Sequence, residues 1–314
     1  MDKLLDEATW HGRRSAHEAR VDRWVEPYLA RRERGIVHPV DDFLFTYYSY
    51  RPASLRRWHP GIGVELRGSS TRGFVDIKGY VVSGDRACLD SRLIADRLRA
   101  APQIGRLLTA TAGRVPQLGC FGLHEWAMVY RQSPSAVRHA TYPLRLGPRG
   151  TDEVVESHRI TCTHYDAFRF FTDPARSLNV VQPSRDTRES LEQPGCLHAT
   201  MDLYKWAYKL APATASQLVA DCFELAYEVR QVDMRASPYD LTALGVAPLR
   251  IETAAGKAEY LDAQRRFAQR GAALRSALIE TCDEVAAALP GRDRVSRSLD
   301  AAQSVGDGVK QRRP

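Results

Sequence analysis

The stretch from residue 197 to residue 289 repeats apolar residues at helical spacing, and no other feature constrains the fold as strongly. Pro194-Gly195 is typical of a turn, and Ala211-Pro212 interrupts the pattern once. The predicted helices span residues 197–210, 213–235 and 255–289. Helices of this length need apolar faces to pack against, so we expect the C-terminal half of the chain to be a helical bundle.

The first 190 residues mix helical and strand signals, and the predicted elements follow from turn residues and periodicity. We expect a helix over residues 1–35, a short aromatic helix that begins at Asp41, and strands over Val64–Leu66 and Gly73–Val82. A helix is expected over 90–112 and a helix or strand over Phe121–Arg131. Short strands are expected near Leu144 and over Arg159–Thr163, followed by a polar loop over 183–194. The sequence therefore predicts a mainly helical α+β fold, with a small strand element in the N-terminal half and a helical C-terminal half. We expect one domain over residues 1–290 and a disordered tail over 291–314, which lacks apolar periodicity.

Composition excludes several classes of protein. The six cysteines include no C-x-x-C pair, which argues against a disulfide framework and against a zinc knuckle. No apolar segment reaches 18 residues, so we predict no membrane contact. The charged, amphipathic start of the chain does not resemble an export signal, and we expect a cytoplasmic location. Oligomeric state cannot be predicted from the sequence.

The net charge of the chain is +7 and its calculated pI is near 9.2, which favours an anionic partner such as DNA or RNA. Most of this charge comes from arginine, because lysine occurs at only six positions: Lys3, Lys78, Lys205, Lys209, Lys257 and Lys310. Arginine is suited to two-pronged contacts with phosphate and to stacking on aromatic rings. A GC-rich genome produces the same bias, so the charge alone does not establish a nucleic-acid partner.

Ionisable side chains follow one narrow stripe of the helix predicted over 197–210. At about 100° per residue, His198, Asp202, Lys205 and Lys209 fall on this stripe. The next helix carries a second polar stripe, made of Gln217, Asp221, Glu224, Glu228, Gln231 and Arg235. Such stripes either face water or hold a proton, a metal ion or a cationic ligand.

Four more titratable residues lie in apolar surroundings, where burial would shift their pKa values. His124 and Glu125 are adjacent in GCFGLHEWAMVY, and His164 and Asp166 alternate like neighbours on one face of a strand. Together with His198 and Asp202 they could form a metal site, or they could make hydrogen bonds within the core. Their spacing matches none of the diagnostic metal motifs such as H-E-x-x-H, so the metal ligands stay unknown.

Aromatic and basic residues alternate between positions 47 and 59. Arg51, Arg56 and Arg57 lie next to tyrosines and to Trp58 in YYSYRPASLRRWH, a pattern that suits phosphate contact combined with base stacking. A core helix followed by a solvated basic turn would give the same pattern.

Several long strings, among them HPVDDFLFTYYSYRP, GCFGLHEWAMVYR, THYDAFRFF, GCLHATMDLYKWAYKL and VDMRASPYDL, resemble a bacterial family known as 3-methyladenine DNA glycosylases. The resemblance extends to about residue 285. It implies an N-glycosidase that flips an alkylated base out of DNA and excises it. The resemblance assigns no catalytic residues in this chain, which has no helix–hairpin–helix motif with a downstream aspartate and no helical repeat.

The chemistry of base excision suggests roles for the residues named above. A cationic alkylated base needs an aromatic pocket and a carboxylate that stabilises the sugar cation or activates water. The candidates for the pocket are Tyr204, Trp206, Trp58 and Trp126. The candidate catalytic residues are Asp202 and Glu125 as carboxylates, with His198, His164 and Asp166 in supporting roles. Base excision requires no cofactor.

Two other functions are compatible with the same residues. One is a metal-dependent oxygenase or hydrolase that acts on a small molecule through the His/carboxylate set. The other is a nucleic-acid-binding protein without catalytic activity. Metal analysis of the purified protein would separate the two enzymatic hypotheses.

Overall fold

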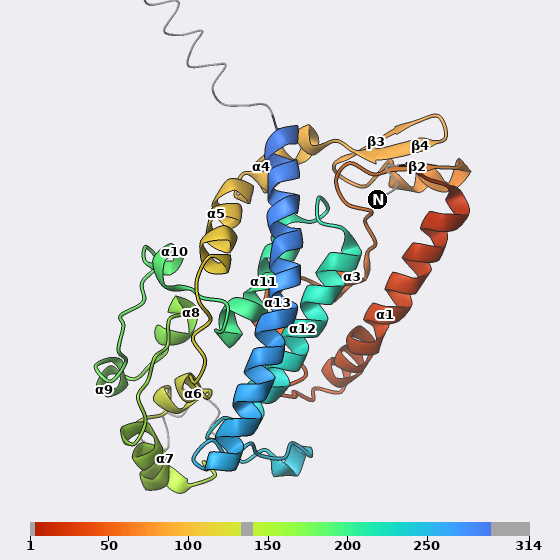
Figure 1. Cartoon of the computed structure of the whole chain (residues 1–314). Coiled ribbons are helices and arrows are strands. Elements are labelled where there is room, and N and C mark those ends of the chain that lie inside the picture. Colours follow the sequence, from red (N-terminus) through yellow and green to blue (C-terminus); the bar gives the residue numbers. More distant parts are fainter. Residues whose placement is uncertain (1–3, 133–140, 290–314) are drawn as a thin grey trace, which may run out of the picture.

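Three C-terminal helices pack against one another and form the centre of the protein. They are α11 (Leu197–Leu210), α12 (Ser216–Arg235) and α13 (Ala254–Ala288), and α13 runs along the other two in Figure 1. The computed structural model describes residues 4–132 and 141–289. The structure is 58% helical and 6% strand, which confirms the mainly helical α+β fold predicted from the sequence.

The packing of α11 against α13 depends on a small residue at their contact. A Cβ atom at Gly271 would lie 3.2 Å from Cγ2 of Thr200 and 3.6 Å from Cδ1 of Leu203. These distances are at or below ordinary van der Waals contact, so glycine allows the two helices to approach closely. The apolar faces of both helices belong to one hydrophobic cluster that extends from Val21 to Val285.

The N-terminal half surrounds this centre with one long helix and many short elements. These are α1 (Glu7–Glu33), α2 (Phe43–Tyr47), α3 (Pro52–Arg56), η1 (Ser69–Phe74), η2 (Ser91–Ile94), α4 (Ala95–Leu98), α5 (Ala101–Ala112), α6 (Leu123–Ala127), α7 (Gly147–Glu156), α8 (Tyr165–Phe168), α9 (Asp173–Arg176) and α10 (Arg188–Leu191). A further 3-10 turn, η4 (Thr242–Leu244), lies between α12 and α13.

Helix α1 is bound to α12 by Arg20, which donates to Asp221 at 2.6 Å and to Glu224. Glu228 of α12 is paired with Arg270 of α13. The polar stripe predicted on α12 is therefore largely engaged by neighbouring helices.

A small sheet of four strands lies beside the N-terminal end of α1 (Figure 1). The strands are β1 (Leu4–Leu5), β2 (Glu65–Arg67), β3 (Tyr80–Ser83) and β4 (Arg86–Leu89), in the order β1-β2-β4-β3. β1 is parallel to β2, and the other two pairs are antiparallel. One face of the sheet packs on a separate cluster that includes Trp10, Trp58 and Phe74.

Several local predictions are wrong. The strand expected over Gly73–Val82 begins only at Tyr80, because the residues before it form the 3-10 turn η1. The strands expected near Leu144 and over Arg159–Thr163 are reduced to isolated bridges, Leu144 with Tyr239 and Ile160 with Asn179. The polar loop expected over 183–194 contains α10, and Glu192 next to it is 2% exposed.

Other predictions hold or lie outside the described residues. The helices expected over 197–210, 213–235 and 255–289 are confirmed to within three residues at each end. No helix in the described ranges is long and apolar enough to cross a membrane. The predicted disordered tail, 291–314, lies outside the residues that the structure describes.

Candidate metal centre

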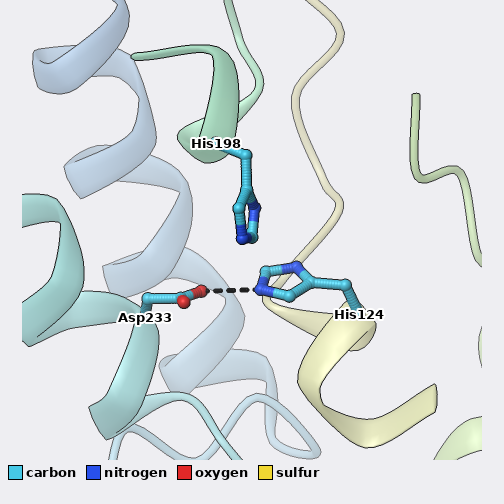
Figure 2. Close-up of side chains that lie close together, drawn as sticks. All are labelled: His124, His198 and Asp233. Carbon is cyan, nitrogen blue, oxygen red and sulfur yellow. Dashed lines mark ion pairs between the residues drawn. The ribbon is translucent and has the colours of Figure 1, made fainter. Parts of the chain in front are cut away.

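Three side chains from three helices converge in the interior of the protein, as Figure 2 shows. His124 comes from α6, His198 from the first turn of α11, and Asp233 from the last turn of α12. One nitrogen or oxygen atom of each side chain lies within 4.8 Å of the corresponding atoms of the other two. His124 and Asp233 are buried and His198 is half-buried.

The short helix α6 is held against the end of α12. Gly122 has a φ of 69°, a left-handed conformation that favours glycine, and it turns the chain into α6. A Cβ atom at this position would lie 3.3 Å from Cβ of Ala236, just beyond α12. The indole Nε1 of Trp126 donates to the carbonyl oxygen of Ala236 at 2.8 Å. These contacts bring His124 to the last turn of α12, where Asp233 lies.

Asp233 belongs to the apolar face of α12 and not to its polar stripe. Cys222, Ala226, Val229 and Asp233 follow one another at spacings of four, three and four residues, so they share a helix face. All four are 0% exposed. The buried face of α12 therefore places one carboxylate, that of Asp233, in the core.

His124 and Asp233 form an ion pair when His124 is protonated (Figure 2), but the contact does not have the geometry of a hydrogen bond. His124 Nε2 lies 3.0 Å from Asp233 Oδ1, yet neither atom has a hydrogen-bond partner among the described residues. A buried polar atom without a partner costs about 1–3 kcal/mol. Metal ligands have this arrangement, because their lone pairs point to a common ion and not to one another. The geometry therefore fits two ligands that share an ion.

Arg230 holds the other oxygen of Asp233. Its Nη1 atom donates to Asp233 Oδ2 at 3.2 Å and to Glu125 Oε1 at 3.0 Å. Its guanidinium carbon lies 3.9 Å from the centre of the Phe43 ring. With one oxygen fixed by Arg230, the carboxylate presents Oδ1 toward the two histidines. Such outer contacts orient metal ligands in known metal sites.

Burial and neighbouring charges shift the pKa values of these groups. Burial lowers the pKa of His124, but the contact with Asp233 and the charge of Glu125 together outweigh burial, and the net shift is upward. Burial lowers the pKa of His198 well below its usual value, and His124 adds to the decrease. Burial raises the pKa of Asp233, but His124 and other cations outweigh the effect of burial and lower this pKa below the usual range. His198 is therefore neutral and Asp233 ionised, which are the forms that bind metals, whereas a metal ion on His124 would displace the proton that Asp233 favours there.

A second group, made of His164, Asp166 and Asp202, also has the composition of a metal site. Here a side-chain cation is already present. Lys205 Nζ donates to Asp166 Oδ2 and to Asp202 Oδ2, each at 3.0 Å. Arg188 donates to Asp202 at 3.3 Å and to Glu192 at 2.7 Å.

Asp202 is fully engaged in this second group. Its other oxygen accepts a hydrogen bond from Tyr48 at 3.0 Å. Burial raises the pKa of Asp202, but Lys205, His164 and Arg188 outweigh it and carry the pKa well below the usual range. Asp202 is therefore the ionised centre of a buried ion-pair network. A metal ion there would have to displace Lys205, whereas Asp233 Oδ1 is approached by no lysine or arginine among the described residues and only by His124 Nε2, itself a possible ligand.

His198 lies between two cavities. The larger one has a volume of about 450 Å³, and Glu125, Arg230 and Asp166 also line it. The smaller one has a volume of about 20 Å³, room for about one water molecule, and it is lined by both His124 and His198. An ion on the three ligands would therefore be next to a cavity of the size that holds a small organic molecule.

The structure brings some predicted site residues together and separates others. All five candidate catalytic residues lie in or next to the two groups: His198 and Glu125 at the first, and Asp202, His164 and Asp166 at the second. The imidazole rings of His164 and His198 are stacked with their centres 5.4 Å apart, which joins the groups. His164 and Asp166 are not strand neighbours as predicted, because His164 caps α8 and Asp166 lies in its first turn.

The predicted base pocket is not assembled around Asp202 as one set. Tyr204 and Trp206 share α11 with Asp202, and the Trp206 ring is approached by three cations, Arg188, Lys205 and Lys209. Trp126 packs in the main cluster under Arg145, whereas Trp58 belongs to the cluster below the sheet.

Two of the predicted phosphate-binding arginines lie in one groove. Arg56 and Arg57 line a groove of about 310 Å³ together with Trp58. Arg56 also donates two hydrogen bonds to Asp22. Arg51 is exposed at the start of α3.

Sequence analysis missed Asp233, Arg230 and Glu192. Asp233 and Arg230 lie on the apolar face of α12 and not on its polar stripe, and their spacing with Ala226 and Val229 is the signal that could have shown them. Glu192 falls within the polar loop predicted over 183–194. No match was found for this chain among protein-family models, curated protein sequences or solved structures.

Proposed function

We propose that this protein is an enzyme that uses one divalent transition-metal ion, held by His124, His198 and Asp233, to act on a small molecule in the adjoining cavity. The observation that carries the proposal is the 3.0 Å approach of His124 Nε2 to Asp233 Oδ1 without a hydrogen bond, next to a third ligand. This is the metal-dependent alternative of the sequence analysis, with Asp233 as the carboxylate in place of Asp202 or Glu125.

The ligand set limits the ion and the chemistry. Two imidazoles and one carboxylate are the protein ligands of many zinc hydrolases and of iron(II) oxygenases, and both leave positions open for water or substrate. Magnesium and calcium prefer oxygen ligands, so two histidines disfavour them. A bound ion would activate water or dioxygen for attack on the substrate.

Two charged residues would support this chemistry. Arg230 keeps Asp233 oriented and balances its charge, and Glu125 in turn holds Arg230. Glu125 lines the cavity with His198, where its carboxylate can accept a proton from a reacting group. Asp202 contributes to the stability of the surrounding network and does not contact the ion.

Metal analysis tests the proposal. Purified protein, stripped with a chelator and dialysed against cobalt(II) or zinc(II), should bind one equivalent per chain at the three-residue site. His124→Ala and Asp233→Asn should each lose that equivalent. The matched control is Asp221→Asn, on the outer face of the same helix, which should keep it. A protein that binds no metal, or whose binding survives both ligand substitutions, would disprove the proposal.

A second function, DNA binding with excision of an alkylated base, stays a proposal. The observation in its favour is the groove that Arg56, Arg57 and Trp58 share, since basic and aromatic groups side by side suit a nucleic acid. If DNA binds there, replacing both arginines by alanine should flatten the logarithmic salt dependence of affinity by about two, roughly one per phosphate contact. An unchanged slope would exclude this groove as the DNA site.

A further inference from the structure

The large cavity beside His198 has a wall in which carboxylates outnumber cations. Asp42, Glu125 and Asp166 line it, whereas Arg230 is the one arginine or lysine among its described lining residues. Nη1 of Arg230 is already bound to two carboxylates. A ligand in the cavity therefore meets more negative than positive groups.

The cations that balance two of these carboxylates lie behind them. Arg31 donates to Asp42 at 2.9 and 2.6 Å, and Lys205 donates to Asp166 at 3.0 Å, but neither basic residue lines the cavity. Each pair is therefore a dipole whose negative end is nearer to the cavity. Beside the low-dielectric protein wall such fixed dipoles act on a ligand more strongly than they would in bulk water.

Aromatic rings complete the wall. Phe43, Tyr47, Tyr142 and Phe170 line the cavity, and the faces of aromatic rings attract cations. Two of these rings already have a guanidinium against them within the protein. Arg230 lies 3.9 Å from the centre of Phe43, and Arg169 lies 4.4 Å from the centre of Phe170. Rings and carboxylates thus favour the same kind of ligand.

We propose that the cavity binds a small organic cation, an ammonium or a protonated nitrogen ring, with its charge toward Glu125 and Asp166 and its apolar part against the aromatic wall. The volume of about 450 Å³ suits a molecule of this size. The further statement that this cation is the substrate rests on the proposed metal-dependent function. Binding of the cation does not depend on that function, because neither Glu125 nor Asp166 is one of the three metal ligands.

Three probes of similar shape and different charge test the proposal by calorimetric titration of the full chain: benzylammonium, benzyl alcohol and benzoate. Benzylammonium should bind at least tenfold more tightly than benzyl alcohol, a difference expected of about one charged contact, and benzoate more weakly than either. Glu125→Gln and Asp166→Asn should each reduce benzylammonium affinity roughly tenfold and leave benzyl alcohol unchanged. The control Asp173→Asn, on an exposed residue of the neighbouring helix α9, should bind all three probes like wild type.

Equal or tighter binding of benzyl alcohol or benzoate would overturn the proposal. So would the failure of all three probes to bind at millimolar concentration, or wild-type affinity for benzylammonium in both cavity variants. Because Glu125 also holds Arg230, Asp166→Asn provides the independent variant if Glu125→Gln does not fold. Metal content is measured in the same samples. Protein that binds no metal but prefers benzylammonium disproves the proposed function alone. Protein that binds metal but does not prefer benzylammonium disproves this inference alone.

Discussion

Lys205 lies between Asp166 and Asp202, with its ammonium nitrogen 3.0 Å from an oxygen of each. Between His124, His198 and Asp233 no lysine or arginine pairs with Asp233 Oδ1 among the described residues. That oxygen lies 3.0 Å from His124 Nε2, with which it forms an ion pair when His124 is protonated, and it has no hydrogen-bond partner. Two clusters with similar composition therefore differ in how their charge is balanced. Lys205 neutralises the cluster around Asp202, and the cluster at Asp233 is the one for which we propose an added metal ion.

Metal binding should stabilise the fold. Adding cobalt(II) or zinc(II) to metal-free protein at about 100 times the dissociation constant should contribute about 2.7 kcal/mol, because the ion binds the folded state alone. In a domain of this size that corresponds to a rise of several degrees in melting temperature, at roughly 2–4 °C per kcal/mol. Differential scanning calorimetry with and without chelator measures the shift. An equal shift in Asp233→Asn would contradict the assigned ligand.

Asp202→Asn should weaken the fold without removing the metal. The substitution leaves Lys205 and Arg188 facing a neutral amide in the interior, and breaking a buried ion pair costs about 3–5 kcal/mol. Urea unfolding and metal analysis check both expectations. The matched control, Asp221→Asn, breaks a more exposed pair with Arg20 and should cost about 1 kcal/mol or less.

The same variant tests the glycosylase hypothesis. If Asp202 stabilises the sugar cation during base excision, Asp202→Asn should lower the release of methylated base from alkylated DNA by a factor on the order of 10²–10³ and keep DNA affinity. Release at the wild-type rate by folded Asp202→Asn protein would remove Asp202 from that reaction.

The sequence predicted the helices of the centre well, because local residues determine where they begin and end. Helix α11 has the bounds expected from the turn at Pro194-Gly195 and from Pro212. The strand expected over Gly73–Val82 failed, because alternation of apolar residues cannot show which backbone groups find a partner. Tyr80–Ser83 is a strand because β4 pairs with it.

The site was only half visible in the sequence. His124 and His198 could be named as candidates because each interrupts an apolar segment. Asp233, the third ligand that we propose, could not be named, since the contact of α6 with the end of α12 is tertiary and follows from no spacing along the chain. Asp233 had one local signal, its place on the apolar face of α12 with Val229, and a search for charges on apolar faces would have found it.

Acid should destabilise the protein through His59. This side chain is 8% exposed, and burial, helped by the charge of Arg57, lowers its pKa from 6.5 to about 4. The unfolded state therefore binds more protons between these two pH values, so stability is present above about pH 6.5 and is lost as pH falls toward 4. The full loss is about 3 kcal/mol, at 1.36 kcal/mol per pKa unit.

The variant His59→Asn should remove this part of the pH dependence. Its free energy of unfolding, measured in urea between pH 7 and pH 4, should fall less steeply than that of wild type. His11→Asn, on an exposed part of α1, is the control and should keep the wild-type slope. Parallel profiles for His59→Asn and wild type would show that His59 is not the group responsible.

Replacing Arg230 should separate its two roles, since its charge balances Glu125 and Asp233 while its geometry orients Asp233. Without metal, Arg230→Met leaves two buried carboxylates uncompensated and should cost about 3–5 kcal/mol of unfolding free energy. Arg230→Lys keeps the charge and should lower the free energy of unfolding by less.

With saturating cobalt(II), the loss of unfolding free energy in Arg230→Met should shrink, because the ion then supplies positive charge beside Asp233. We expect this charge effect to outweigh the loss of the contact that orients Asp233, so by thermodynamic linkage the variant should bind cobalt(II) more tightly than wild type does. Urea unfolding of both variants with and without the ion measures this difference. A cost that stays the same in the presence of cobalt(II) would show that the ion and Arg230 do not share Asp233, and the assignment of this carboxylate as a metal ligand would fail.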